Sequence, residues 1–235
     1  MNRIEKKFMD LKQNNEKALV GFVTAGDPDM DTSLKIITAM CGNGIDILEL
    51  GVPFSDPTAD GPVIQRSSVR ALKNNVSLKM VIKMVSELRR QTEIPIIIFS
   101  YYNPILAFGA NHFRPEAITA GADGVLVVDL PHEESAEFTY DWANNGFSLI
   151  KLLAPTTPQK RMAEIASSAT GFLYLVSKTG VTGSDGLDTS EINTQMQLLR
   201  SVTNLPVCVG FGISTADDVA AVASMADGVV IGSAF

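Results

Sequence analysis

Eight short apolar runs alternate with segments of helical pattern along the chain, and this alternation constrains the fold more than any other feature. Most of the runs are nearly continuous in apolar and β-branched residues, which is typical of parallel strands covered on both faces. The predicted strands are Ala18–Ala25, Ile45–Leu50, Ile94–Ser100, Gly124–Asp129, Phe147–Leu153, Gly171–Ser177, Leu205–Gly212 and Ala226–Ser233. The helix expected after the seventh strand begins at a Ser214 N-cap, with acidic residues in its first turn.

Alternating strands and helices over 235 residues are compatible with a doubly wound sheet or with a closed barrel. Eight strands without an early glycine-rich dinucleotide fingerprint favour a (β/α)8 barrel, formed by residues 1–235 as a single domain. The segment Glu5–Asn15 predicts an extra N-terminal helix that closes the N-terminal end of the barrel. Because the sequence stops at Phe235, directly after the eighth strand, we expect the C-terminal helix of a complete barrel to be missing from these residues.

Composition narrows the classes of partner. The formal net charge of −7 disfavours nucleic acid, whose phosphates an acidic surface repels. The charged N-terminus has no signal-peptide h-region and no apolar run approaches ~20 residues, so we expect a soluble cytoplasmic protein. Cys41 and Cys208 are expected to be buried free thiols, and His112 and His132 surface or capping residues, with no metal site.

Glu49 places a carboxyl group inside an apolar strand, one residue before the predicted end of that strand. In the alternation Ile45, Ile47, Glu49 it shares a face with two apolar residues. Functional groups of a parallel barrel lie at the C-terminal ends of the strands. Burial there would raise the pKa of Glu49 and allow proton transfer near neutral pH. The alternative is a structural glutamate paired with a cation or a backbone donor.

Asp60 follows in a loop that is rich in proline and glycine and that leaves the same strand. An aspartate in such a loop usually caps a turn. Together, however, Glu49 and Asp60 would present two carboxyl groups to a common mouth, which favours a catalytic pair. Asp56, in the same loop, is expected to form a turn or a surface contact.

Glycine-rich stretches follow the last three predicted strands: "TGVTGSDG", "VGFGIS" and "IGSAF". Glycines at neighbouring strand ends allow backbone N–H groups to turn toward one anion, and a short helix starting at Gly232 would add its dipole. A phosphate site after strands seven and eight recurs in barrel enzymes. We therefore favour a phosphate site, although the glycines also suit tight turns.

Other residues give weaker signals. Tyr174 alternates with Phe172 in the sixth strand and is either a core tyrosine or a pocket residue. The polar, aromatic segment Ser100–Pro104 could line a pocket or bind a partner. Lys151 lies in mid-strand and Lys178 in a glycine-rich loop, so neither is placed for a Schiff base.

Several motifs together resemble the tryptophan synthase alpha-subunit family. They are "ALVGFVTAGDPD", "DILELGVPFSDPTADGPVIQRSSVRAL", "SYYNP", "GADGVLVVDLPHEES", "YLVSKTGVTG" and "VGFGIS", in this order. The stretch "LGVPFSDPTADGP" is the most specific of them. The resemblance implies a TIM barrel, and family members continue for about one helix beyond the position of Phe235.

The resemblance also implies an activity: a lyase that cleaves indole-3-glycerol phosphate to indole and glyceraldehyde 3-phosphate by a retro-aldol reaction. The acid/base of the family falls on Glu49 and the carboxylate that receives the indole N–H on Asp60, with Tyr174 beside the reacting centre. The indole pocket falls on three apolar residues: Phe22, Phe99 and Leu126. The phosphate and lid positions fall on Thr182, Gly183, Phe211, Gly212, Gly232 and Ser233.

The resemblance implies a partner as well, a beta subunit in an alpha2-beta2 complex. Asp56, Asn103 and Pro104 fall on the surface that faces this partner. No cofactor is expected in this chain, since pyridoxal phosphate (PLP) belongs to the beta subunit. Two other functions stay open: a weakly active subunit that mainly activates its partner, and another phosphosugar isomerase or epimerase barrel.

Overall fold

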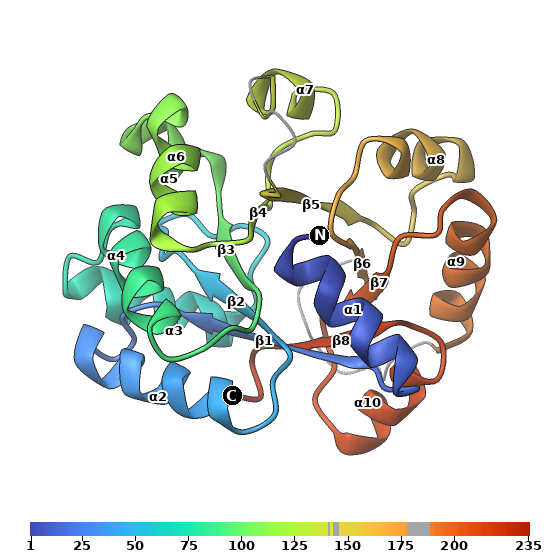
Figure 1. Cartoon of the computed structure of the whole chain (residues 1–235), viewed down its shortest axis with the longest axis horizontal. Coiled ribbons are helices and arrows are strands. Elements are labelled where there is room, and N and C mark those ends of the chain that lie inside the picture. The colour runs from blue at the N-terminus through green and yellow to red at the C-terminus, as the bar shows by residue number, and fades with distance from the viewer. Residues whose placement is uncertain (141, 143–145, 178–188) are drawn as a thin grey trace.

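The computed structural model describes residues 1–140, 142, 146–177 and 189–235, and it contains a closed barrel of eight parallel strands. Each strand pairs with its neighbours in sequence, and β8 closes the barrel against β1. Figure 1 looks onto one end of this barrel, with the helices arranged around the strands. The strands are β1 (Ala18–Thr24), β2 (Ile47–Gly51), β3 (Ile96–Ser100), β4 (Gly124–Val127), β5 (Ser148–Leu153), β6 (Leu173–Val176), β7 (Val207–Gly210) and β8 (Gly228–Ile231).

Ten helices are present in the described part of the chain. They are α1 (Arg3–Gln13), α2 (Met30–Gly42), α3 (Pro62–Lys73), α4 (Leu78–Arg89), α5 (Tyr102–Phe108), α6 (Ala110–Ala120), α7 (Ser135–Phe138), α8 (Gln159–Ser167), α9 (Thr189–Val202) and α10 (Ala216–Ala223). The predicted order of strands and the barrel are thereby confirmed.

The strands are shorter than the apolar runs predicted, for local reasons. The seventh run was expected to continue to Gly212, but Phe211 and Gly212 have φ values of 79° and 74°, which end the extended conformation at Gly210. The eighth run ends at Ile231, because a turn closed by the Phe235 N–H and the Gly232 carbonyl (3.0 Å) follows it.

Two further expectations were wrong in detail. Ile45 precedes β2 and packs in the outer core between sheet and helices, so only Ile47 shares the inward face with Glu49. The N-cap of α10 is Thr215, not Ser214, because the Thr215 hydroxyl accepts from the Asp218 N–H (3.1 Å) and the Asp218 carboxylate accepts from the Thr215 N–H (2.9 Å). This reciprocal pair is a capping box.

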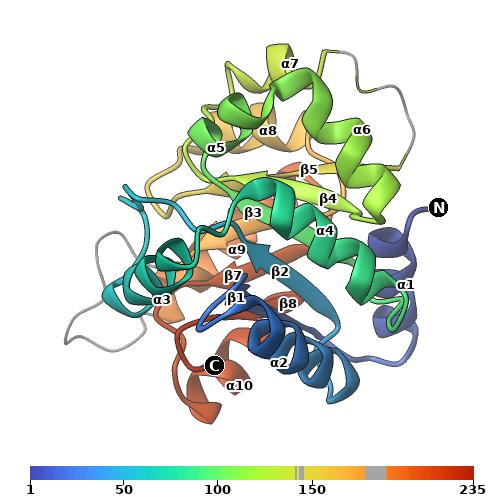
Figure 2. The same ribbon diagram turned by 90° about the vertical axis from the view of Figure 1, so that its left-hand side faces the viewer.

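The helix α1 closes one end of the barrel, as predicted from Glu5–Asn15. Ile4, Phe8 and Leu11 are buried and join the cluster of residues that fills the barrel interior. The Phe8 ring lies 5.7 Å from that of Phe172 on the segment leading into β6. Figure 2 shows α1 at one end of the barrel and the loop that follows β2 at the other.

We predict that Phe8→Ala lowers the free energy of unfolding by about 3 kcal/mol, because it leaves a cavity under the barrel. Lys12→Ala, on the exposed face of α1, is the control and should change it by less than about 0.5 kcal/mol. Urea unfolding of both variants measures the difference. Equal effects would mean that α1 does not close the barrel in solution.

Candidate active site

The candidate site lies at the C-terminal end of the barrel, opposite α1 (Figure 2). Residues that are paired in register on neighbouring parallel strands lie side by side and point to the same face of the sheet. The register therefore brings the predicted side chains together inside the barrel. Phe22 on β1 pairs with Glu49 on β2, and Phe99 on β3 pairs with Leu126 on β4. Tyr174 on β6 pairs with Leu152 on β5 and with Cys208 on β7.

Glu49 is fully buried inside this end of the barrel. Its side chain has an exposed fraction of 0%, and neither carboxyl oxygen has a hydrogen-bond partner among the described residues. Burial penalises the carboxylate form, and it raises the pKa of Glu49 to about 8. At neutral pH Glu49 is therefore mostly a neutral acid with a proton to donate.

Asp60 is half-buried in the loop between β2 and α3, and burial raises its pKa to about 6. A hydrogen bond from the Tyr101 hydroxyl opposes this shift, because it stabilises the carboxylate. The same hydroxyl accepts the N–H of Ala59 at 2.9 Å. At neutral pH Asp60 is mostly ionised, which gives the two carboxyl groups of the site opposite protonation states.

Tyr101 is a residue of the site that the sequence did not single out. The segment "SYYNP" predicted an aromatic loop, but nothing in it indicates which of its two tyrosines faces Asp60. Tyr101 is 3% exposed, and its ring lies 5.1 Å from that of Phe54 in the loop after β2. It therefore ties this loop to the end of β3.

Tyr174 is buried beside the two carboxyl groups. Burial raises its pKa well above the ordinary value, and the charges of Glu49 and Asp60 add to the effect. The hydroxyl lies over Gly210, where a Cβ atom would come within 2.1 Å of it. Only glycine at position 210 leaves room for this tyrosine, and sequence analysis did not identify that requirement.

The three apolar residues predicted to line the indole pocket lie in one cluster inside the barrel. Phe99 and Leu126 are buried in the barrel interior, and Phe22 packs against the same cluster. The rings of Phe22 and Phe99 lie 4.9 Å apart in an edge-to-face arrangement. This edge-to-face pair adds favourable contact energy to the burial of apolar surface.

The predicted phosphate residues lie at the ends of neighbouring strands. Phe211 and Gly212 follow β7, and Gly232 and Ser233 follow β8. The space next to Gly212 is open, since a Cβ atom there would meet nothing within 4 Å. The Ser177 hydroxyl donates to the Gly210 carbonyl (2.8 Å) and to that of Phe211, which fixes the loop after β7. Thr182 and Gly183 lie outside the described residues.

The residues predicted for a partner surface lie near one another. Asp56 is exposed in the loop after β2, while Asn103 is exposed and Pro104 half-buried in α5. The contacts that Tyr101 makes with Ala59 and Phe54 hold this loop against the start of α5. The three residues therefore belong to one rim of the barrel.

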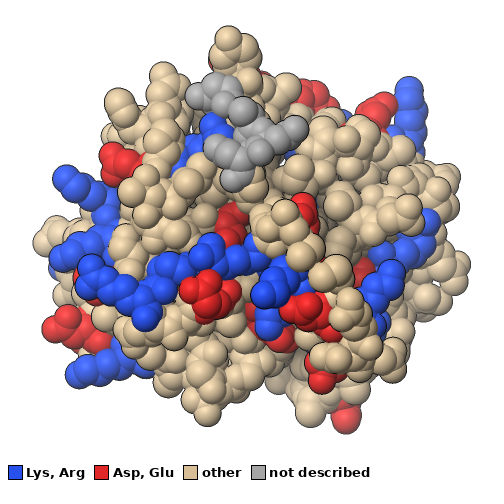
Figure 3. Space-filling model, in the orientation of Figure 1, with Lys and Arg blue, Asp and Glu red and all other residues tan. Residues whose placement is uncertain are grey.

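The described part of the chain does not meet the requirements of a metal site or of a membrane-spanning helix. Among the described residues, no cluster of His, Cys, Asp and Glu is suited to a metal ion. None of the helices in the described ranges has the length and apolar content to cross a bilayer. On the face seen in Figure 3, basic and acidic side chains lie next to one another.

Cys41 and Cys208 are free, with Cys208 buried and Cys41 half-buried.

Comparison with known proteins gives a consistent result. A family model described as tryptophan synthase alpha chain matches residues 8–235. The tryptophan synthase alpha chain of Desulfosudis oleivorans is 65% identical over 235 residues, which is 100% of this chain and 89% of that protein. The alpha chain of Desulfatibacillum aliphaticivorans is 60% identical over the same shares.

The comparison with solved structures leads to the same family as the comparison of sequences. The structure of tryptophan synthase subunit alpha from Legionella pneumophila has a TM-score of 0.90 and 41% identity, covering 100% of this chain and 87% of that one. Tryptophan synthase from M. tuberculosis in its aminoacrylate-bound form has a TM-score of 0.90 and 29% identity, with 100% and 90% covered.

Proposed function

The chain belongs to the tryptophan synthase alpha-chain family, and from this premise we propose that Glu49 and Asp60 carry out its lyase reaction. The alpha chain is the indole-3-glycerol-phosphate lyase of tryptophan biosynthesis. The observation that carries the assignment of residues is the buried carboxyl group of Glu49, which has no hydrogen-bond partner among the described residues.

The reaction needs one group that first donates and then accepts a proton. Protonated Glu49 donates its proton to C3 of the indole ring, which places positive charge on the ring nitrogen. The Glu49 carboxylate that results takes the proton of the glycerol hydroxyl next to the scissile bond. The C–C electrons then return to the ring, releasing indole and the aldehyde glyceraldehyde 3-phosphate. Glu49 ends the cycle protonated, as it began.

Asp60 is suited to the complementary role. It is ionised at neutral pH and accepts a hydrogen bond from the indole N–H, which stabilises the positive charge that builds up when C3 is protonated. A preorganised charge of this kind contributes a few kcal/mol to the stability of the transition state. Tyr174 lies beside both carboxyl groups and limits the space around the reacting atoms.

The remaining residues hold the two ends of the substrate. Phe22, Phe99 and Leu126 form an apolar surface for the indole ring. We assign the phosphate to backbone N–H groups of Phe211, Gly212, Gly232 and Ser233, which follow the neighbouring strands β7 and β8. Thr182 and Gly183 are assigned to the lid and the phosphate only through the family resemblance.

The family works without a cofactor in the alpha chain, and PLP lies in the beta subunit. We propose that this chain binds a tryptophan synthase beta subunit in an alpha2-beta2 complex in the cytoplasm. Support comes from the related M. tuberculosis structure, which is named tryptophan synthase. The rim with exposed Asp56 and Asn103 and half-buried Pro104 is the surface we assign to this contact.

Indole release from indole-3-glycerol phosphate tests the function, measured first for this chain alone and then with a tryptophan synthase beta subunit. We expect weak release alone and a large increase with the partner. Strong stimulation of the beta reaction without any indole release would favour the purely regulatory subunit. Isomerisation of a phosphosugar without indole release would favour the other barrel enzymes.

Tyr101 provides a separate test of the role of Asp60. We predict that Tyr101→Phe raises the pKa of Asp60, because the variant lacks the hydroxyl that stabilises its carboxylate. The acidic limb of the profile of kcat/KM against pH should move upward, with a loss of about tenfold near pH 6 and less at pH 8. Tyr102→Phe is the matched control. Identical profiles for both variants would contradict this positioning role.

A further inference from the structure

A buried lysine lies on the outer side of the barrel wall, away from the candidate active site. Lys151 is on β5 between Ile150 and Leu152, both of which pack with the residues inside the barrel. Its side chain therefore points the opposite way, into the layer between the sheet and α7 and α8. Lys151 is only 8% exposed.

Three neutral acceptors surround the Lys151 ammonium group. Nζ lies 2.7 Å from the Ser168 hydroxyl, 3.0 Å from the Ser135 hydroxyl and 3.1 Å from Nδ1 of His132. The Ser135 hydroxyl donates to the His132 carbonyl and so accepts from the lysine. His132, expected to be a surface or capping residue, is thus a member of this cluster. Its Nδ1 accepts, so the imidazole is neutral.

No acid of the described residues forms an ion pair with Lys151. The nearest acid in sequence to His132 is Glu133, whose carboxylate is held by both terminal nitrogens of the Arg161 guanidinium (2.6 and 3.1 Å). The other acid that acts on His132 is Glu164 on α8. Among the described residues Nζ has only neutral partners, so a carboxylate that reached it would form a shorter and stronger charge-assisted hydrogen bond than these partners do.

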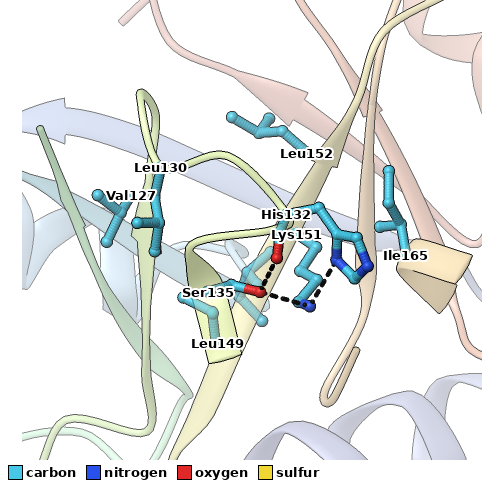
Figure 4. A pocket seen from close by; sticks show the side chains of 9 residues that line it. Val127, Leu130, His132, Ser135, Leu149, Lys151, Leu152 and Ile165 are labelled. Atoms are coloured by element: carbon cyan, nitrogen blue, oxygen red, sulfur yellow. Dashed lines mark hydrogen bonds between the residues drawn. The ribbon is translucent and has the colours of Figure 1, made fainter. Parts of the chain in front are cut away.

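A pocket adjoins this ammonium group. Figure 4 shows Lys151, His132 and Ser135 close together, with apolar side chains around them. The pocket is small, with a cavity volume of about 50 Å³, and it is partly open to solvent. Its apolar side chains on this outer side of the sheet are Val127, Leu130, Leu149 and Ile165, while Ile150 and Leu152 border it where they flank Lys151 on β5. A largely apolar pocket with a few convergent polar groups is the usual form of a small-ligand site.

We propose that this pocket binds a small monocarboxylate with a short apolar tail, its carboxylate against Lys151 and His132 and its tail among the leucine side chains. The carboxylate replaces His132 as an acceptor for Nζ, since this is the longest of the three contacts. His132 then becomes a donor when it is protonated. The apolar walls favour butyrate over inorganic phosphate, which has no part that benefits from them.

Histidine NMR tests this proposal, because the chain has only two histidines. Burial and the nearby Lys151 lower the pKa of His132 in the free protein, while Glu133 and Glu164 act in the opposite direction. Bound carboxylate should raise the pKa of His132 by about 1, as an opposite charge in contact does. The protein labelled with ¹⁵N-histidine is titrated with sodium butyrate at constant ionic strength, and the exposed His112 serves as the internal control.

Two variants make the result specific. Lys151→Met removes the charge and keeps the length of the side chain, and it should abolish the butyrate effect on His132. Lys160→Met changes an exposed lysine on α8 and should keep the effect. A saturable change confined to His132 that is lost in Lys151→Met supports the site. No change, the same change at His112, persistence in Lys151→Met, or an equal response to phosphate or chloride would overturn it.

Discussion

Glu49→Gln is expected to reduce kcat/KM for indole release by at least about 10³-fold while the barrel stays folded. General acid–base groups contribute about 10²–10⁴-fold each, and in the proposed mechanism Glu49 acts in both proton transfers. Glutamine has nearly the same shape and can neither donate nor accept the proton. Steady-state indole release with excess beta subunit measures the loss, and circular dichroism reports the fold. Full activity of the variant would rule out Glu49 as the acid/base.

The same variant should become more stable than the wild type as the pH rises. The pKa of Glu49 is about 8 in the folded protein and 4.5 when exposed, so the folded state holds a proton that the unfolded state releases. The contribution of protonated Glu49 to the free energy of unfolding is therefore fully present below pH 4.5 and decreases as the pH rises to about 8. The pKa of Glu49 differs by 3.5 between the folded and unfolded states, and each pKa unit corresponds to 1.36 kcal/mol. Above pH 8 the wild type therefore loses about 5 kcal/mol of stability through Glu49, whereas Glu49→Gln has no proton to lose and shows no such decrease.

Urea unfolding at several pH values measures this relative gain in stability. Glu116→Gln, an exposed position on α6, is the control and should follow the wild type at every pH. If the stability of Glu49→Gln ran parallel to that of the wild type from pH 4.5 to 8, the glutamate would be ionised in the folded protein. It would then be unable to serve as the acid in the first step.

Asp60→Asn is expected to lower kcat/KM by about 10²–10³-fold, because it removes the charge that stabilises the protonated indole ring. The loss should be in kcat more than in KM, since the positive charge exists only after C3 is protonated. Unchanged kcat with a raised KM would indicate that Asp60 only binds substrate.

The dependence of kcat/KM on pH shows whether the acidic limb comes from Asp60 or from the phosphate group of the substrate. The wild type should have a bell-shaped profile, with an acidic limb near 6 from Asp60 and a basic limb near 8 from Glu49. The second pKa of a phosphate ester also lies near 6. In Asp60→Asn the acidic limb should disappear from the residual activity, and a limb that persists would belong to the phosphate.

The barrel could be predicted from the sequence because its signals are local. Near-continuous apolar runs identify strands covered on both sides, and eight of them with helical segments between leave few arrangements. The strand ends were less certain, because they depend on backbone geometry. Phe211 adopts a positive φ that is uncommon for a phenylalanine, and nothing in "VGFGIS" separates it from a continuing strand.

The site could be predicted only where a residue contradicts its surroundings. Glu49 is visible as a charge in an apolar strand, and Asp60 as its neighbour at the same end of the barrel. Tyr101 and Gly210 were missed because their roles depend on contacts between distant segments. The same is true of Lys151 and His132, which are 19 residues apart and meet only when α7 packs on β5.

In the proposed mechanism the two carboxyl groups have different roles because their surroundings differ. Glu49 is on a rigid strand, fully enclosed and without a donor among the described residues, so it keeps its proton. Asp60 is in a partly exposed loop with a hydrogen bond from Tyr101, so it loses its proton about two pH units lower. Membership of the lyase family and this difference in protonation together explain why a carboxyl group is placed inside an apolar strand.

The central claim is that Glu49 is a neutral acid in the resting protein, and a ¹³C NMR titration of its carboxyl carbon tests this most directly. Glutamate is labelled at the side-chain carboxyl carbon, and the Glu49 signal is assigned as the one absent from Glu49→Gln. We predict that this signal titrates near pH 8. Titration near 4.5, the value of an exposed glutamate, would contradict the proposed mechanism.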